Sequence, residues 1–319
     1  MQYYKYFIQH TLPCLRRVHL LTLLFVTLIS TSALAQQEPM YSQYMFNMLQ
    51  INPAYAGNRA SSNITGVYRK QWVSVDGAPT TFAISWDKRK EMSNVGYGFQ
   101  IYNDKLGVEN TMGAQGFYSY RIPFRKSFLS FGLSGGFMYY RAELSKLVIS
   151  NNSDPLFQAD YAVALPTAGV GVLYATQDWY AGLSSPALLK TKIAGIHNEL
   201  TTSADQHYFL TGGYIFQATE GVKLKPSFLL KAVQGAPLEC DFNLNGWIND
   251  AVGLGVSYRT NDALVTMIEL QVSPVFRFGY AYDYIISNLS TYNSGTHELM
   301  LRYEFSTKKE QKILSPRYY

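Results

Sequence analysis

The chain has 319 residues with 27 basic and 22 acidic side chains, a formal net charge of +5, and no basic patch of the kind that binds nucleic acid. Charged residues make up only 15% of the chain, against ~25% in soluble domains, while aromatic residues make up another 15% and include 26 tyrosines. No apolar stretch after residue 35 approaches the ~18 residues of a membrane-spanning helix. These features favour a closed transmembrane β-barrel, because only helices and closed sheets satisfy every backbone group in lipid.

Residues 1–35 have the features of a signal peptide for export. Basic residues precede an almost unbroken apolar run at 20–29, and Ala33-Leu34-Ala35 fits the small-x-small rule for cleavage. Cleavage there predicts a mature chain that begins at Gln36 and is exported to the cell outer membrane. Its single cysteine, Cys240, cannot form an intramolecular disulfide.

The segment 36–60, between the predicted cleavage site and the first strand, is too rich in apolar and aromatic side chains to lie in water. Met45, Met48 and Leu49 predict a short helix that stops before Pro53, with Asn52 held extended by the proline. We expect the segment to be buried as a plug in the periplasmic half of a barrel lumen. The alternative is a flexible periplasmic tether that orders only on a partner.

The stretch 61–305 predicts an all-β fold, a single transmembrane antiparallel β-barrel of about 14 strands of outer-membrane type. The predicted strands are 61–69, 80–88, 94–103, 109–122, 127–140, 167–176, 179–184, 207–217, 222–231, 240–248, 251–259, 263–272, 276–284 and 297–305. Short joins alternate with mostly longer ones, which predicts an even strand count with both chain ends in the periplasm, including a tail at 306–319. The short join 260–262, on the side of the longer ones, is an exception.

Side chains alternate between the two faces of these segments with a period of two. In 276–284 five aromatic side chains point one way, while the residues between them, which include Arg277 and Asp283, point the other. We expect the aromatic face to contact lipid and Arg277 and Asp283 to lie inside. The opposite placement would mean a register shift of one residue.

Eight polar side chains in the last strands lie opposite the apolar stripes, which predicts a polar network in the lumen. They are Arg259, Glu269, Gln271, Arg277, Asp283, Glu298, Arg302 and Glu304. Charges away from water are usually paired, so we expect the network to neutralise itself, with Gln271 opposite Arg277 and Glu269 diagonal to it. A solute path or a contact with the plug that responds to a partner is the alternative.

The mature chain carries no pattern that predicts an enzyme, a cofactor site or a metal site. His197, His207 and His297 do not stand at metal-ligand spacing, and there is no cysteine pair. His207 and His297 open predicted strands, where a ring at the membrane interface is the ordinary explanation. The glycines in 132–136 and 169–171 lie in strand patterns with no following helix, so close backbone approach or sheet curvature explains them better than a phosphate loop.

Several separated motifs occur in order along the mature chain. The first is Tyr41-Ser42-Gln43-Tyr44-Met45-Phe46-Asn47 followed by Ile51-Asn52-Pro53-Ala54-Tyr55-Ala56-Gly57. Others are Arg69-Lys70-Gln71-Trp72 with Gly77-Ala78-Pro79, Asp154-Pro155-x-Phe157, Pro166-x-x-Gly169-x-Gly171, Tyr180-x-Gly182-x-Ser184-x-Pro186, Gly279-Tyr280-Ala281-Tyr282-Asp283, and Gly295-x-His297-Glu298-Leu299-Met300-Leu301. In these motifs the chain resembles the PorP/SprF family, which are barrels of the type IX secretion system. Met48 departs from the family pattern, which has proline after the asparagine.

The resemblance implies a non-enzymatic outer-membrane component that works with periplasmic secretion and gliding-motor proteins. Its implied partners are outer-membrane lipid, periplasmic subunits including a peptidoglycan-associated protein, and a large secreted adhesin or cargo, with no nucleic acid among them. A transporter for a hydrophobic small molecule is the alternative, because the long-chain fatty-acid barrels are similar in strand number and in having a plug with an Asn-Pro-Ala element.

Overall fold

The computed structural model of the chain describes residues 40–305 except 60, 148–158, 190, 195–200, 205 and 234–235. The predicted signal peptide 1–35 and the predicted tail 306–319 lie outside the described residues, as does His197. No helix in the described part of the chain is long and apolar enough to cross a membrane.

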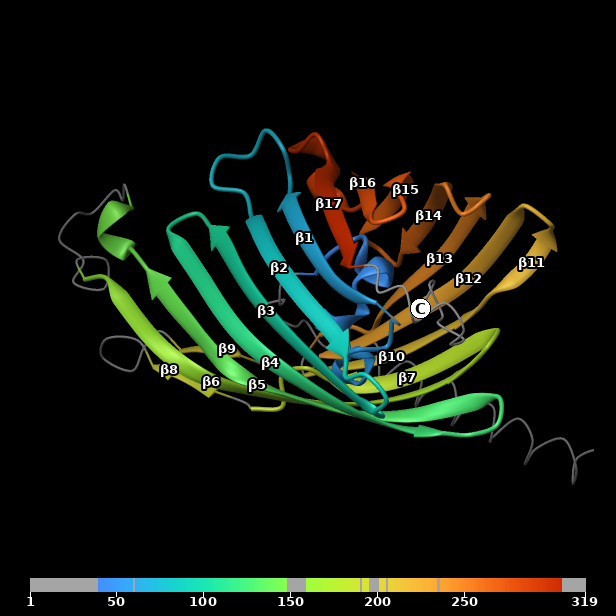
Figure 1. Ribbon diagram of the computed structural model, residues 1–319. Helices are drawn as coiled ribbons and strands as arrows, with labels where there is room; N and C mark the ends of the chain where they lie inside the picture. The colour runs from blue at the N-terminus through green and yellow to red at the C-terminus, as the bar shows by residue number, and fades with distance from the viewer. Residues whose placement is uncertain are drawn as a thin grey trace, which may run out of the picture.

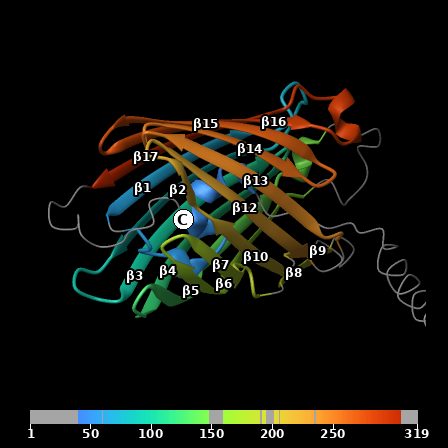
Figure 2. The same ribbon diagram turned by 90° about the vertical axis from the view of Figure 1, so that its right-hand side faces the viewer.

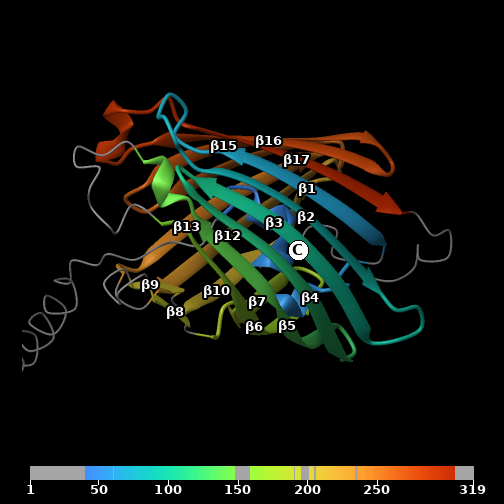
Figure 3. The same cartoon turned by 90° about the vertical axis from the view of Figure 1, so that its left-hand side faces the viewer.

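Fourteen antiparallel strands close into a barrel, as predicted (Figures 1, 2 and 3). The wall strands are β1 (Ser62–Lys70), β2 (Thr80–Arg89), β3 (Val95–Leu106), β4 (Glu109–Pro123), β5 (Ser127–Ala142), β6 (Tyr161–Thr176), β7 (Trp179–Ser185), β10 (His207–Tyr214), β12 (Val222–Val233), β13 (Glu239–Ile248), β14 (Val252–Arg259), β15 (Ala263–Ser273), β16 (Phe276–Ile285) and β17 (Thr296–Phe305). Pairing of β1 with β17 and of β10 with β12 closes the sheet on itself.

The predicted strand 207–217 is interrupted at Ile215, whose N–H donates to Asp178 O at 2.6 Å. The chain beyond it, β11 (Phe216–Thr219), also pairs with β12, so β10 and β11 together occupy one position in the wall. The long join after β7 contains a separate hairpin, β8 (Thr191–Ala194) and β9 (Thr201–Ala204), which we did not predict.

β6 begins at Tyr161, six residues before the predicted start at 167. The strand includes Pro166, although proline cannot donate a ladder hydrogen bond. In the structure Pro166 pairs with Phe137 of β5, whereas β7 pairs only with Val170–Ala175 of β6. Pro166 therefore has a strand neighbour on one side only, which is where a strand tolerates proline.

The two faces of the wall differ as the alternation predicts. In β14 the side chains of Leu254, Val256 and Tyr258 are exposed on the outside, and Ser257 and Arg259 between and beside them are buried. In β16 Arg277 and Asp283 are buried inside and the aromatic side chains lie on the other face, which confirms the predicted register.

The joins 90–94, 124–126, 177–178, 220–221, 249–251 and 274–275 share one end of the barrel, which we call the periplasmic end from their shortness. We call the opposite end the outer end. One join there, predicted as 104–108, is only a two-residue turn, because β3 continues to Leu106 and Gly107 adopts a positive φ of 57°.

The N-terminal segment, residues 40–59, lies within the barrel, where Figures 1 and 2 show it in blue. Instead of the one predicted helix it forms three 3₁₀ turns, η1 (Tyr44–Phe46), η2 (Met48–Gln50) and η3 (Pro53–Tyr55). Asn52, between the last two, is extended, with φ −144° and ψ 114°, as the following proline predicts. The apolar side chains of the segment pack with inward side chains of the wall in the largest cluster of the buried core.

Candidate functional site

The inward faces of β1, β13, β14, β16 and β17 carry a buried group of charges, which we name the Arg69 cluster. Arg69 Nη1 lies 2.9 Å from Glu298 Oε2, and Arg69 Nη2 lies 2.9 Å from Asp283 Oδ2. Arg259 Nη1 lies 3.8 Å from Asp283 Oδ2, and Arg259 Nε lies 3.1 Å from Asp241 Oδ1. Because β1 and β17 are the first and last strands, the cluster is assembled only when the barrel closes.

The N-terminal segment donates hydrogen bonds to the same carboxylates. The N–H groups of Ser42 and Gln43 donate to the two carboxylate oxygens of Glu298 at 2.7 and 2.8 Å, and Ser42 Oγ donates to Asp283 Oδ2 at 2.6 Å. Arg69 Nη1 also donates to Ser42 Oγ at 2.6 Å. Hydrogen bonds to charged groups are the strong ones, so the start of the segment is fixed to three wall strands.

A second group, which we name the Arg302 cluster, lies on β15, β16 and β17 nearer the periplasmic end. Arg277 Nη1 lies 3.0 Å from Glu269 Oε2. Arg302 donates from Nη2 to the carbonyl oxygen of Phe46, which also accepts from Arg59 Nη2 at 3.0 Å. Arg302 of the wall and Arg59 of the segment thus meet at one backbone carbonyl, and Arg302 Nη1 also lies 3.9 Å from Glu269 Oε1.

The eight residues of the predicted polar network are divided between these clusters and the barrel rim. Arg259, Asp283 and Glu298 lie in the Arg69 cluster, and Glu269, Arg277 and Arg302 in the Arg302 cluster. The other two are half-buried nearer the periplasmic rim. Glu304 Oε1 lies 3.6 Å from Arg59 Nη1, and Gln271, opposite Arg277 in the β15–β16 pairing, donates from Nε2 to Ser273 O at 2.7 Å.

Sequence reasoning missed Arg69 and Asp241 as members of the lumen network. Their signal is the same alternation that identified the others. Arg69 shares the inward face of β1 with Val67 and Thr65, and Asp241 shares the inward face of β13 with Asn243. Both lie outside the last strands, to which the prediction confined the network.

Glycines on the inward face allow the segment's backbone to approach the wall. A Cβ on Gly132 of β5 would collide with the backbone N of Ala54, and one on Gly171 of β6 would collide with the side-chain oxygen of Asn52. We predicted close backbone approach or sheet curvature for these glycines; Gly132 allows the close approach of the segment's backbone, and Gly171 makes room for the side chain of Asn52.

Serines beside the glycines donate to the segment's backbone carbonyls. Ser119 Oγ donates to Ala56 O at 2.7 Å, Ser130 Oγ to Ala54 O at 2.9 Å, and Ser184 Oγ to Ile51 O at 2.8 Å. These bonds satisfy groups that short 3₁₀ turns leave open, which is required of buried backbone.

Asn52 connects the segment to β6 and also shapes its own turn. Its Oδ1 accepts from Ala54 N at 2.9 Å, which caps η3, and its Nδ2 donates to Val172 O at 3.1 Å. The asparagine therefore orders the Asn-Pro-Ala turn and attaches it to the wall at the same time.

The segment runs along the lumen instead of lying only in its periplasmic half, so that part of our prediction is wrong. Ser42 contacts Asp283 and Glu298, which lie near the outer ends of β16 and β17. At the other end Gly57 O accepts from Arg89, the last residue of β2 at the periplasmic end. Glu298 lies near the outer end and accepts hydrogen bonds from the N–H groups of Ser42 and Gln43. The segment therefore begins near the outer end and runs toward the periplasmic end.

His207 and His297 lie in different environments. His207 is 1% exposed and faces the interior, so the expected interface position is wrong for it. His297 is half-buried, with its Nδ1 2.7 Å from Tyr280 OH. Among the described residues no group of three or more His, Cys, Asp or Glu side chains is placed to hold a metal ion.

Three solved outer-membrane proteins match the chain at low identity and with TM-scores below 0.5. The Acinetobacter baumannii outer membrane protein Omp33 is 8% identical with a TM-score of 0.46, over 78% of this chain and 100% of that one. A Pseudomonas aeruginosa FadL homologue is 11% identical with a TM-score of 0.46, over 86% and 96%. The translocator domain of the autotransporter NalP from Neisseria meningitidis is 10% identical with a TM-score of 0.44, over 78% and 89%.

No curated protein matches this sequence. The family model for the type IX secretion system membrane protein PorP/SprF matches residues 33–303. That match includes the N-terminal segment and all the wall strands but the last two residues of β17. Together with the closed 14-strand barrel, it places the chain in the PorP/SprF family of type IX secretion system membrane proteins.

Proposed function

We propose that this chain serves type IX secretion as a sealed, non-enzymatic outer-membrane barrel. In this role it assists the export or surface anchoring of a large cargo protein or adhesin and docks to periplasmic subunits, including a peptidoglycan-associated one. The N-terminal segment is its plug. The observation that carries the proposal is the attachment of Ser42 and Gln43 to Glu298, inside a cluster that Arg69 completes.

A segment attached in this way supports a closed lumen. Its hydrogen bonds go to charged side chains at both ends, Glu298 at the outer end and Asp87 at the periplasmic end, where Asp87 Oδ2 accepts from Gly57 N at 3.0 Å. Release of the segment would leave these buried charges without those donors, which is costly. Function then resides on the loops and rims of the barrel.

The alternative, a transporter for a hydrophobic small molecule, fits the lumen less well. The cavity beside the segment has a volume of about 60 Å³, whereas pockets that bury a drug-sized ligand have ~300–1,000 Å³. Gln50, Gln100 and Gln115 also line it, and their carboxamides do not suit an apolar solute.

Deletion of the gene tests the proposal. We expect general growth to be unchanged, while surface display of a dedicated large protein, or spreading on agar, is abolished and then restored by the wild-type gene. Loss of uptake of a defined hydrophobic nutrient, with secretion unaffected, would contradict the proposal and favour the transporter.

A further inference from the structure

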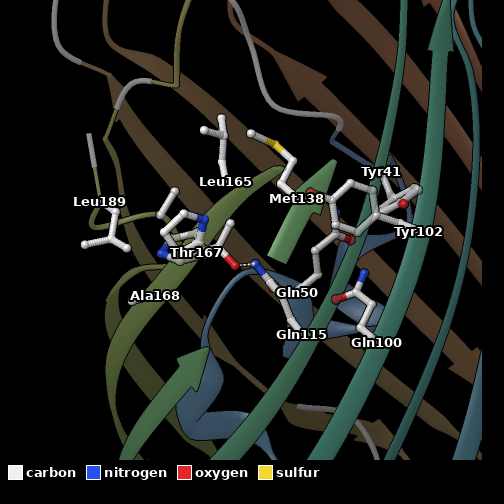
Figure 4. Close-up of a pocket in the computed structure, with 13 residues that line it drawn as sticks. Tyr41, Gln50, Gln100, Tyr102, Gln115, Met138, Leu165, Thr167, Ala168 and Leu189 are labelled. Carbon is white, nitrogen blue, oxygen red and sulfur yellow. Dashed lines mark hydrogen bonds between the residues drawn. The ribbon is translucent and has the colours of Figure 1, made fainter. Parts of the chain in front are cut away.

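A cavity of about 60 Å³ lies between the N-terminal segment and the inward faces of β3 to β6 (Figure 4). Tyr41 and Gln50 of the segment contribute to its lining, and residues 186–189, which follow β7, form another side. Tyr102 and Leu165 in its wall belong to the outer-end halves of β3 and β6. The cavity therefore lies on the side of the segment that faces the predicted cell exterior.

Gln100 brings a buried carboxamide to the lining of this cavity. It is 2% exposed, and within the described part of the chain its carboxamide makes no hydrogen bond. Figure 4 shows it beside the carboxamide of Gln50. A carboxamide offers two donors and an acceptor, and a buried one without partners is costly, so the cavity is suited to a polar occupant.

The rest of the lining restricts the chemistry of that occupant. None of the 13 lining residues is charged. Beside the glutamines and Thr167, whose Oγ1 accepts from Gln115 Nε2 at 3.2 Å, stand the apolar side chains of Met138, Leu165 and Leu189. An occupant that fits is neutral, with a hydrogen-bonding group and an apolar part.

The size and the pairing chemistry favour peptide. A volume of this size holds about four to six waters, enough for one side chain or one peptide unit of a longer ligand. A glutamine carboxamide matches a peptide group, since each has an N–H donor and a C=O acceptor.

We propose that this cavity binds one peptide unit of an uncharged stretch of peptide, with its amide group hydrogen-bonded to Gln100 and its apolar atoms toward Met138, Leu165 and Leu189. The inference rests on the proposed function, because the peptide belongs to the protein whose export the barrel assists. Beyond the proposed function, the inference states that the outer half of the lumen recognises the exported protein.

Saturation-transfer NMR on the purified full chain in detergent tests the inference. The probe is the capped neutral dipeptide N-acetyl-leucyl-glutamine methylamide, and the comparison probes are its glutamate analogue and methyl glucoside. We expect the neutral dipeptide to bind in the millimolar range and at least tenfold more tightly than its charged analogue. Gln100→Leu weakens its binding at least tenfold, whereas the matched control Gln217→Leu, an exposed glutamine of β11, leaves it unchanged.

Folding of each variant is checked by heat-dependent mobility on a gel. If Gln100→Leu fails to fold, Met138→Phe, which fills the cavity from its apolar side, is expected to give the same loss. Binding of methyl glucoside instead of the dipeptide, or no binding of any probe by the folded wild type, overturns the inference. So does normal surface display in a Gln100→Leu strain when the deletion strain has none, an outcome that leaves the proposed function intact.

Discussion

Arg69 holds two carboxylates that come from strands more than 200 residues away in the chain, Asp283 and Glu298. All three groups are buried, and the segment's own N–H groups supply the remaining hydrogen bonds to Glu298. A buried ion pair adds little when compared with an apolar replacement of the whole set, but removal of one partner leaves an uncompensated charge. The Arg69 cluster is therefore sensitive to single substitutions.

We predict that Arg69→Met destabilises the barrel by ~3–5 kcal/mol, since it strands the charges of Asp283 and Glu298. The temperature at which the folded barrel loses its gel mobility is the measurement. Arg141→Met is the matched control, because Arg141 pairs with Glu143 at 2.7 Å while its side chain is 49% exposed, and we expect it to cost at most ~1 kcal/mol. Equal effects of the two variants would show that the Arg69 cluster contributes no more than a surface pair.

Two glycines of β5 allow a second comparison at this scale. Gly132→Ala places a methyl group against the backbone of Ala54, whereas Gly135→Ala meets only Thr167 O at an ordinary 3.9 Å. We expect Gly132→Ala to displace the segment, so that protease cuts between residues 41 and 57 while the barrel stays intact. Gly135→Ala is expected to resist as the wild type does, and cleavage of the wild type itself would argue against an enclosed segment.

The N-terminal segment, at the scale of an element, has little regular structure of its own. Its three 3₁₀ turns carry no side-chain cap except that of Asn52. Its order comes from the wall, through serine hydroxyls, close glycines and the two charge clusters. An element of this kind folds only when the barrel has formed around it.

Deletion of residues 41–57 is therefore expected to open the lumen without preventing strand pairing. In planar bilayers the wild-type protein should conduct poorly, and the deletion variant should show a stable ionic conductance. Retention of heat-dependent gel mobility checks that the deleted protein is still a barrel. A wild type with a large conductance, unchanged by the deletion, would contradict a sealed lumen.

At the scale of the whole molecule, closure joins the two ends of the chain. β1 and β17 pair over residues 62–70 and 297–305, and this contact brings Arg69 to Glu298. Six short joins lie at one end, with the first and last residues of the wall at the same end, although the joins 107–108 and 260–262 at the other end are also short. A right-side-out barrel then places residues 90–94 in the periplasm and residues 286–295 outside the cell.

Cysteine labelling tests this orientation in a background in which Cys240 is replaced by serine. Met92 and Tyr292 are both strongly exposed, one in each kind of join. A membrane-impermeant maleimide should label Tyr292→Cys in intact cells and Met92→Cys only after the outer membrane is permeabilised. The reverse pattern would invert the barrel and place the cavity of Gln100 on the periplasmic side.

The sequence alone determined the strands, their faces and the number of wall positions. It could do so because strand alternation is a local property: whether Arg277 and Asp283 face inward depends only on their neighbours along the chain and on the presence of lipid on one side. Two of the differences between the observed and the predicted strand ends lie near Pro166, where β7 no longer pairs with β6, and at Ile215, where a strand is interrupted. Both displacements depend on a neighbouring strand.

Only the tertiary structure decided which polar groups meet and how the N-terminal segment lies. Closure of the sheet brings Arg69 to Glu298, and the path of the segment brings Ala54 to Gly132. The local sequence pattern predicts neither contact. The sequence likewise indicates only that Gln100 is an inward polar residue of β3. The packing of the segment against the wall is what places a cavity next to it. Periodicity fixes the side of the wall on which a residue lies, but its partner across the lumen depends on the three-dimensional course of the whole chain.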